Sequence, residues 1–262
     1  MQSKVAISSG ELAIVHRVEV AGAPTLVFLH DSLGCIQTWR DFPHELATQT
    51  GCNYLIYDRL GHGASSSHPQ GRRRQQGYLE AEADILIDLL QRLHVSQPLL
   101  FGHSDGASIA LIAAAQNGNN IKGLILEAPH IFVEDITLEG VHKTRENYPG
   151  GILKQLLTKY HGDKTDDVFY AWADTWLSAG FRTWNIEHLL PQISCPCLIV
   201  QGEQDEYGTM WQLEGIANSI SGAAKVEVIK GIGHAPHKEA GELTLALCTS
   251  FVETLNLTEG EY

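Results

Sequence analysis

The chain has 262 residues, of which 44% are hydrophobic and 19% charged, and its formal net charge is −13. This length fits one α/β domain with an insertion, and the apolar fraction is enough for a sizeable core. The acidic balance argues against nucleic-acid binding, and no run approaches the roughly 20 apolar residues that cross a bilayer. Because the first residues lack the apolar core of a signal peptide, we expect a cytoplasmic protein that binds neither nucleic acid nor membrane.

Short apolar runs alternate with amphipathic stretches along most of the chain. In chain order, the predicted elements are strands at 4–8, 11–20 and 25–29, a helix at 38–47, a strand at 53–57, a helix at 79–93, a strand at 99–101, a helix at 107–115, strands at 123–127, 197–200 and 226–229, and a last helix at 239–255. Strands that are apolar on both faces and alternate with helices form a parallel sheet covered by helices on both sides. We therefore predict a mostly parallel eight-stranded sheet, with functional residues in the loops that follow the strands.

The alternation breaks between about residues 130 and 190, where the sequence is helical and rich in aromatic residues. This segment lies between two strands that are neighbours in the predicted sheet. We predict that residues 131–190 form a helical cap inserted into a single domain that spans residues 1–262. Trp172 and Trp176 fall on one helical face with Phe169, and this face either packs the cap onto the core or lines an apolar substrate pocket.

The run Gly102-His103-Ser104-Asp105-Gly106 lies between the strand at 99–101 and the helix at 107–115. A serine between strand and helix is typical of a nucleophile elbow, which projects the hydroxyl above the sheet, and the glycines let strand and helix approach closely. The alternative interpretation is an inert serine at a helix N-cap. The strand–turn–helix context favours a nucleophile, so we predict this role for Ser104.

A serine hydroxyl is a weak nucleophile that needs a base, and the base needs an acid to orient it. Among the 13 histidines, His234 follows the last strand and the flexible run Gly231-Ile232-Gly233. We therefore predict His234 as the base in preference to His237. Asp205 directly follows the seventh strand and is the predicted acid, with Glu127 as the second candidate.

Five segments, taken in order, resemble those of a known family. They are His30-Asp31-Ser32-Leu33-Gly34, Tyr57-Asp58-Arg59-Leu60-Gly61-His62-Gly63, Gly102-His103-Ser104-Asp105-Gly106, Gly202-Glu203-Gln204-Asp205 and Gly233-His234-Ala235-Pro236. With these segments the sequence resembles the α/β-hydrolase superfamily over essentially its whole length, and it looks closest to the small capped esterase-like members. The resemblance implies that the backbone N–H groups of Ser32 and Asp105 form an oxyanion hole.

Two positions depart from the pattern of that family. Asp31 stands where the family usually has glycine, and Asp105 stands where it usually has an apolar or amide residue. An unpaired carboxylate at either position would oppose the negative charge that forms on the oxyanion. We therefore expect both carboxylates to be turned away and paired, with His30 and His103 as the nearest candidate partners.

The resemblance implies a serine hydrolase that cleaves carboxylic esters of a small or medium apolar substrate through an acyl-enzyme, as a monomer or homodimer, with no metal or organic cofactor. One alternative is a hydrolase that cleaves a carbon–carbon bond in a dienoic ketone acid, with Arg145 or Arg182 of the cap holding the substrate carboxylate. Another is a ligand-sensing protein that keeps the triad but turns over slowly.

Other polar features carry no predicted chemistry. The run Arg72-Arg73-Arg74 is the one basic cluster, and it is either a solvated loop or a docking point for an anionic substrate or carrier protein. The five cysteines are odd in number and scattered, so we expect reduced thiols.

Overall fold

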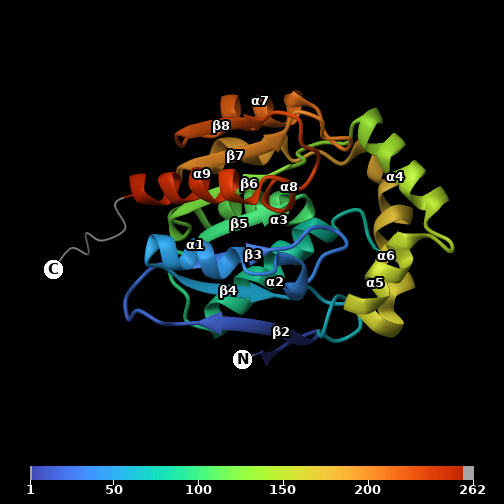
Figure 1. Cartoon of the computed structure of the whole chain (residues 1–262), viewed down its shortest axis with the longest axis horizontal. Helices are drawn as coiled ribbons and strands as arrows, with labels where there is room; N and C mark the ends of the chain where they lie inside the picture. Colours follow the sequence, from blue (N-terminus) through green and yellow to red (C-terminus); the bar gives the residue numbers. More distant parts are fainter. Residues whose placement is uncertain (1, 73, 256–262) are drawn as a thin grey trace.

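The computed structural model describes residues 2–72 and 74–255, and the strands found there form one sheet (Figure 1). The strands are β1 (Ser3–Ile7), β2 (Gly10–Arg17), β3 (Thr25–Leu29), β4 (Asn53–Tyr57), β5 (Leu99–His103), β6 (Gly123–Glu127), β7 (Cys197–Gly202) and β8 (Ala224–Ile229). Their order across the sheet is β1-β2-β4-β3-β5-β6-β7-β8. The pairs β1–β2 and β2–β4 are antiparallel and the other pairs are parallel. The predicted eight-stranded, mostly parallel sheet is confirmed.

Helices cover both faces of this sheet. The α-helices are α1 (Phe42–Thr50), α2 (Tyr78–Arg92), α3 (Asp105–Asn117), α4 (Asp135–Asn147), α5 (Ile152–His161), α6 (Thr165–Trp176), α7 (Met210–Ser219), α8 (Pro236–Glu239) and α9 (Gly241–Thr254). The 3-10 helices are η1 (Ile36–Trp39), η2 (Gly118–Asn120), η3 (Gly162–Lys164), η4 (Phe181–Thr183) and η5 (Glu187–Gln192). No helix in the part of the chain that the structure describes is long and apolar enough to span a membrane.

The central strands supply two separate apolar layers. Leu26 and Phe28 of β3 share one cluster with residues of α1 and α9, whereas Val27 and Leu29 share the other with residues of α2 and α3. Successive side chains of a strand point to opposite faces, so an uninterrupted apolar strand serves both layers. This is why β3, β4, β5 and β6 are buried along their whole length.

Two predicted helices differ from those in the structure. The stretch predicted as a helix at 38–47 is split into η1 and α1, because Arg40 between them has a positive φ of 52°, and Pro43 lies in the first turn of α1. The helix predicted at 239–255 begins two residues later, as α9, because Ala240 has a φ of −135° outside the helical range. The short helix α8, which was not predicted, precedes Ala240 and directly follows the loop that contains His234.

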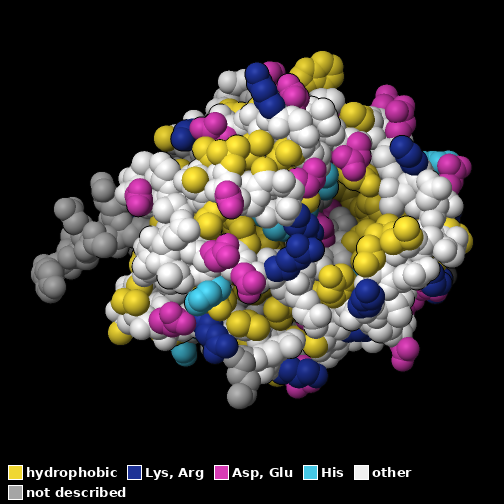
Figure 2. All heavy atoms as spheres, in the orientation of Figure 1, with side chains coloured by type: hydrophobic (Ala, Val, Ile, Leu, Met, Phe, Trp, Pro, Cys, Tyr) yellow, Lys and Arg dark blue, Asp and Glu magenta, His cyan; other side chains and the backbone are white. Residues whose placement is uncertain are grey.

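Between β6 and β7 the chain forms α4, α5, α6 and the short helices η3, η4 and η5. We call residues 131–190 the helical insertion. In Figure 1 its long helices stand together at one end of the sheet, on the right. Figure 2 shows the surface hollowed where the insertion meets the strand ends, with hydrophobic side chains on the insertion side. The insertion therefore lies over the edge of the sheet where residues that follow β5 and β7 lie.

Candidate active site

Ser104 lies at a sharp turn between β5 and α3. Its backbone has φ 55° and ψ −119°, a conformation that non-glycine residues rarely adopt. A Cβ atom on Gly102 would collide with the backbone of Gly106 and Ala107, and one on Gly106 would collide with the carbonyl oxygens of Leu29 and His30. Glycine is therefore required at both positions, and the turn has the geometry that was predicted for a nucleophile elbow.

The structure brings Ser104, His234 and Asp205 into hydrogen-bonding contact. The distance from His234 Nε2 to Ser104 Oγ is 3.0 Å, and His234 Nδ1 lies 2.9 Å from each carboxylate oxygen of Asp205. Asp205 also accepts the backbone N–H of Tyr207 at 2.8 Å. In this arrangement His234 donates its Nδ1–H to Asp205 and accepts the hydroxyl proton of Ser104 at Nε2.

Asp205 and His234 shift each other's pKa values. Burial by itself would lower the pKa of His234, but the charge and hydrogen bond of Asp205 outweigh burial and raise it above its usual value. Burial would raise the pKa of Asp205, but the imidazole of His234 and the Tyr207 N–H outweigh burial and lower it. Asp205 is therefore ionised at neutral pH and stabilises a proton on His234.

Ser32 and Asp105 line the same cavity as Ser104 and His234. Asp105 is the first residue of α3, and the first N–H groups of an α-helix have no partner within the helix. Ser32 belongs to the loop after β3, which neighbours β5 in the sheet. The two residues predicted for the oxyanion hole thus share the cavity with the nucleophile, and Asp105 lies at the positively polarised end of α3.

The carboxylate of Asp105 is paired, but not with the predicted partners. Tyr78 donates its hydroxyl to Asp105 Oδ2 at 2.8 Å, and Arg59 Nη1 lies 3.7 Å from the same oxygen. Burial raises the pKa of Asp105, although Arg59 and Tyr78 act in the opposite direction. The spacing of residues in the sequence gave no signal for the contact between Arg59 and Asp105.

The carboxylate of Asp31 has one of its two predicted neighbours. Its Oδ2 atom lies 3.5 Å from His103 Nδ1 and 3.8 Å from Lys238 Nζ. Because burial lowers the pKa of His103 to about 4, Lys238 is the charged partner at neutral pH. The expectation for His30 was wrong, since its Nδ1 atom contacts the backbone carbonyl of Asp31 rather than the carboxylate. Both Asp31 and Asp105 belong to the residues that line the cavity.

The cavity above Ser104 has a volume of about 180 Å³. Trp172 and Trp176 line it as predicted for a pocket, whereas Phe169 instead stacks on Tyr148 with ring centroids 3.4 Å apart. The lining residues that sequence reasoning missed are Leu33, His130, Thr137, Val141, Thr144, Leu153 and Tyr207. The helical spacing of Thr137, Val141 and Thr144 on α4 is a signal that could have found three of them.

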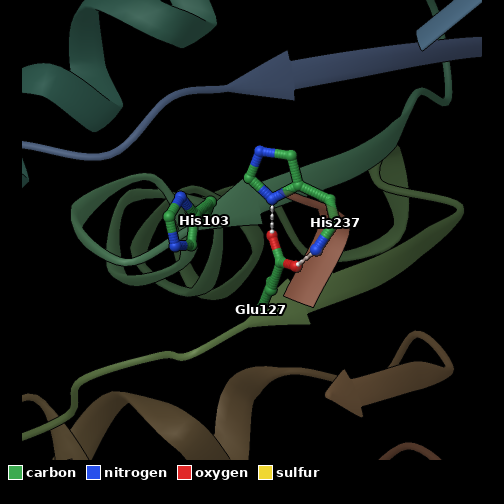
Figure 3. Close-up of side chains that lie close together, drawn as sticks. All are labelled: His103, Glu127 and His237. Carbon is green, nitrogen blue, oxygen red and sulfur yellow. Dashed lines mark hydrogen bonds and ion pairs between the residues drawn. The ribbon is translucent and has the colours of Figure 1, made fainter. Parts of the chain in front are cut away.

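The second candidates for base and acid, His237 and Glu127, pair with each other (Figure 3). His237 Nδ1 lies 2.5 Å from Glu127 Oε2, and the backbone N–H of His237 donates to Glu127 Oε1. His103 lies beside this pair and donates its Nε2–H to the backbone carbonyl of His234 at 2.9 Å. The second pair therefore anchors the loop on which His234 lies.

His103, Glu127 and His237 are also the described residues that could hold a metal ion, because their ligand atoms lie within 4.8 Å of one another. Both oxygens of Glu127 already accept hydrogen bonds from His237, and all three residues are buried. A cation would have to replace those hydrogen bonds before it could bind. The observed geometry is that of a hydrogen-bonded pair.

Arg72 of the basic run contacts the helical insertion. Arg72 Nε lies 2.7 Å from Asp167 Oδ1, and its guanidinium lies 5.1 Å from the ring centroid of Tyr170. Arg74 donates to the carbonyl of Gly71 at 2.5 Å, and Arg73 lies outside the described residues. Arg72 thus has an ion-pair partner on α6.

The chain is similar to known alpha/beta hydrolases in sequence and in structure. The model of the alpha/beta hydrolase family matches residues 26–247. The human serine hydrolase BPHL is 28% identical over 233 residues, which are 84% of this chain and 76% of that protein. A 2-succinyl-6-hydroxy-2,4-cyclohexadiene-1-carboxylate synthase of Salmonella paratyphi C is 34% identical over 113 residues, 42% of this chain and 40% of the synthase. The structure of MGS-M2, an alpha/beta hydrolase from a deep-sea metagenome library, superposes with a TM-score of 0.79 at 19% identity over 99% of each chain.

Proposed function

The chain belongs to the alpha/beta hydrolase family, and from this premise we propose that it is a serine hydrolase that cleaves carboxylic esters through an acyl-enzyme. The observation that carries the proposal is the continuous contact from Ser104 Oγ through His234 to Asp205 at the wall of a cavity. The similarity to human serine hydrolase BPHL supports the same chemistry. We propose Ser104, His234 and Asp205 as the catalytic residues.

The first step joins the serine to the acyl group. Ser104 Oγ attacks the ester carbonyl carbon while its proton passes to His234 Nε2, 3.0 Å away. Asp205 keeps the imidazole in the required tautomer and stabilises the imidazolium. His234 then gives the proton to the leaving alkoxide, and the alcohol departs. Water attacks the acyl-enzyme with the same base, which releases the acid and restores Ser104.

The oxyanion of the tetrahedral intermediate needs donors that are already in place. We propose the backbone N–H groups of Ser32 and Asp105 for this role, with the dipole of α3 adding to them. The Asp105 carboxylate is held by Tyr78 and Arg59, and that of Asp31 by Lys238. These partners offset the unfavourable effect of two carboxylates near a forming negative charge.

Cavity size and lining support a small or medium apolar acyl or alcohol group. A volume of about 180 Å³ is below that of a drug-sized ligand site. The helical insertion supplies the apolar wall through Val141, Leu153, Trp172 and Trp176. We propose that the insertion acts as the cap that shapes this pocket and excludes water.

Carbon–carbon bond cleavage of a ketone acid has less support. Arg145 pairs with Asp174 and Arg182 pairs with Asp135, and both arginines are exposed. Among the described residues, no lysine or arginine lines the cavity, so no such side chain there would bind a substrate carboxylate directly. The same argument disfavours the activity named for the Salmonella synthase, whose product carries a carboxylate.

Two measurements test the proposal. A fluorophosphonate probe should label the wild type and a control variant, Ser221→Ala, and should not label Ser104→Ala. Hydrolysis of p-nitrophenyl butyrate should fall about 10⁴-fold or more in Ser104→Ala. Undiminished hydrolysis by Ser104→Ala would refute the assignment. A wild-type kcat far below the usual range of about 1–1000 s⁻¹ across a panel of esters would favour the slow ligand-sensing alternative.

A further inference from the structure

His130 lies on the cavity wall close to the reacting groups, yet the triad does not use it. It follows β6 by three residues and lines the cavity together with Ser104 and His234. Its ring centroid is 5.9 Å from that of His234 and 5.3 Å from that of Trp176. The imidazole is therefore held where the polar and apolar walls of the cavity meet.

The Nδ1 atom of His130 is buried and has no hydrogen-bond partner among the described residues, and the residue as a whole is 2% exposed. Buried side-chain nitrogens are nearly always hydrogen-bonded, because an unpaired polar group costs free energy when it leaves water. His130 also belongs to the cavity lining. A polar ligand group that reaches this unsatisfied imidazole would therefore gain a hydrogen bond.

The backbone of the His130 loop is fixed on both sides. Ser108 Oγ donates to the carbonyl of His130 at 2.6 Å, and Gln212 Oε1 accepts the N–H of Ile131 at 2.8 Å. Gln212 also donates to the carbonyl of Phe132 and to the carboxylate of Glu134, and it is completely buried. A backbone fixed in this way keeps the His130 ring at one place on the cavity wall, as discrimination between ligands requires.

His130 is neutral at neutral pH. Burial and the nearby His234 lower its pKa to about 3. A neutral imidazole offers one N–H donor and one acceptor nitrogen. The ionisable groups that act on it are His234, Asp205 and His103, and no lysine or arginine of the described residues lines the cavity. The surroundings therefore favour a neutral polar group over a carboxylate.

We propose that His130 determines specificity by hydrogen-bonding a neutral polar group of the substrate, such as a hydroxyl or amide. The preferred substrates are then esters that combine an apolar part, held by Trp172 and Trp176, with one such group close to the scissile carbonyl. This inference rests on the proposed function and names the substrate class of the same site.

The test compares matched substrates in matched variants. The substrates are p-nitrophenyl butyrate and its 2-hydroxy and 3-hydroxy derivatives, which differ from it in one hydroxyl group. His130→Phe keeps a flat ring and removes both nitrogens, whereas His130→Gln keeps a donor and an acceptor. For at least one derivative, the kcat/KM ratio of hydroxylated to plain ester should be about threefold to tenfold higher in the wild type than in His130→Phe, the effect of one hydrogen bond. His130→Gln should restore part of this ratio.

The same ratio for all derivatives in the wild type and His130→Phe would overturn the inference. Calorimetric binding of the corresponding N-methyl amides, which are not hydrolysed on this time scale, gives the ratio as dissociation constants. This readout does not depend on ester cleavage. If the wild type cleaves no ester, the proposed function is refuted. If its preference for hydroxylated amides is at the same time lost in His130→Phe, the role of His130 is supported. If the wild type cleaves esters normally and His130→Phe changes neither the kcat/KM ratio nor the ratio of dissociation constants, the proposed function is supported and the role of His130 is refuted.

Discussion

Two carboxylate–imidazole pairs lie at the same edge of the sheet, and they differ in what the imidazole faces. In the Asp205–His234 pair, the second ring nitrogen of the histidine reaches Ser104 Oγ. In the Glu127–His237 pair, the imidazole packs against Trp39 with ring centroids 4.6 Å apart. The pairs have the same chemical groups and similar hydrogen bonds. The difference is that the imidazole of the Asp205–His234 pair reaches a hydroxyl in a cavity, whereas that of the Glu127–His237 pair does not. We therefore treat the first pair as the candidate catalytic pair and the second as a structural pair.

The two pairs also depend on each other. The Glu127–His237 pair fixes the start of α8, directly after the His234 loop. Glu239 of the same helix accepts the N–H groups of Gly233 and Ala235, on either side of His234. A buried pair thus positions the loop of an accessible one, and substitutions should separate their roles.

The largest expected effect is a loss of catalysis when the Asp205–His234 pair is changed. Asp205→Asn should lower kcat about 10⁴-fold, because the amide favours the wrong tautomer of His234 and cannot stabilise its charge. The matched change Glu127→Gln should lower kcat much less, since Glu127 does not contact His234. Steady-state kinetics with p-nitrophenyl butyrate measure both. If Glu127→Gln were as severe as Asp205→Asn, the assignment of the two pairs would be wrong.

The next largest expected effect is a loss of stability when the Glu127–His237 pair is changed. His237→Leu removes the imidazole and leaves the completely buried Glu127 carboxylate without its main partner. A buried charged group left without a hydrogen-bond partner costs about 1–3 kcal/mol or more, so the free energy of unfolding in urea should fall by about that amount. His188→Leu, at an exposed position, is the control. Equal stability of His237→Leu and wild type would contradict the role of this pair.

The smallest effect is the pH dependence of catalysis. The pKa of His234 lies above its usual value of 6.5 because Asp205 outweighs the effect of burial. A base must be unprotonated, so kcat/KM should be constant at high pH and should fall about tenfold per unit once the pH drops below this pKa. In Asp205→Asn the midpoint of the residual activity should move to lower pH. A midpoint that does not move would show that Asp205 does not raise the pKa of His234.

Much of the fold could be predicted because burial on both faces leaves a strand few choices of residue. The strands at 25–29, 53–57 and 123–127 have the predicted bounds, since each is a fully apolar run or nearly so. The helices predicted at 38–47 and 239–255 show the limit of the method. The backbones of Arg40 and Ala240 leave the helical range locally, whereas hydrophobic periodicity continues across both residues.

The candidate site was predicted as far as local rules reach. Ser104 follows from the glycines around it, and Asp205 and His234 follow from their places after strands. The same rule also applies to His130, which follows β6, but no local feature distinguished it from packing histidines. The partners of Asp105 could not be predicted from the sequence, because Tyr78 lies on α2 and Arg59 lies in the loop after β4.

The sequence by itself determined the order of strands and helices, the strained turn at Ser104 and the residues that follow each strand. These are local properties, fixed by backbone sterics and by the period of apolar side chains. The tertiary structure decided which imidazole of His234 and His237 meets the hydroxyl and which is sealed against Trp39. That choice depends on contacts between residues more than a hundred positions apart, which exist only after the strands have been assembled into one sheet.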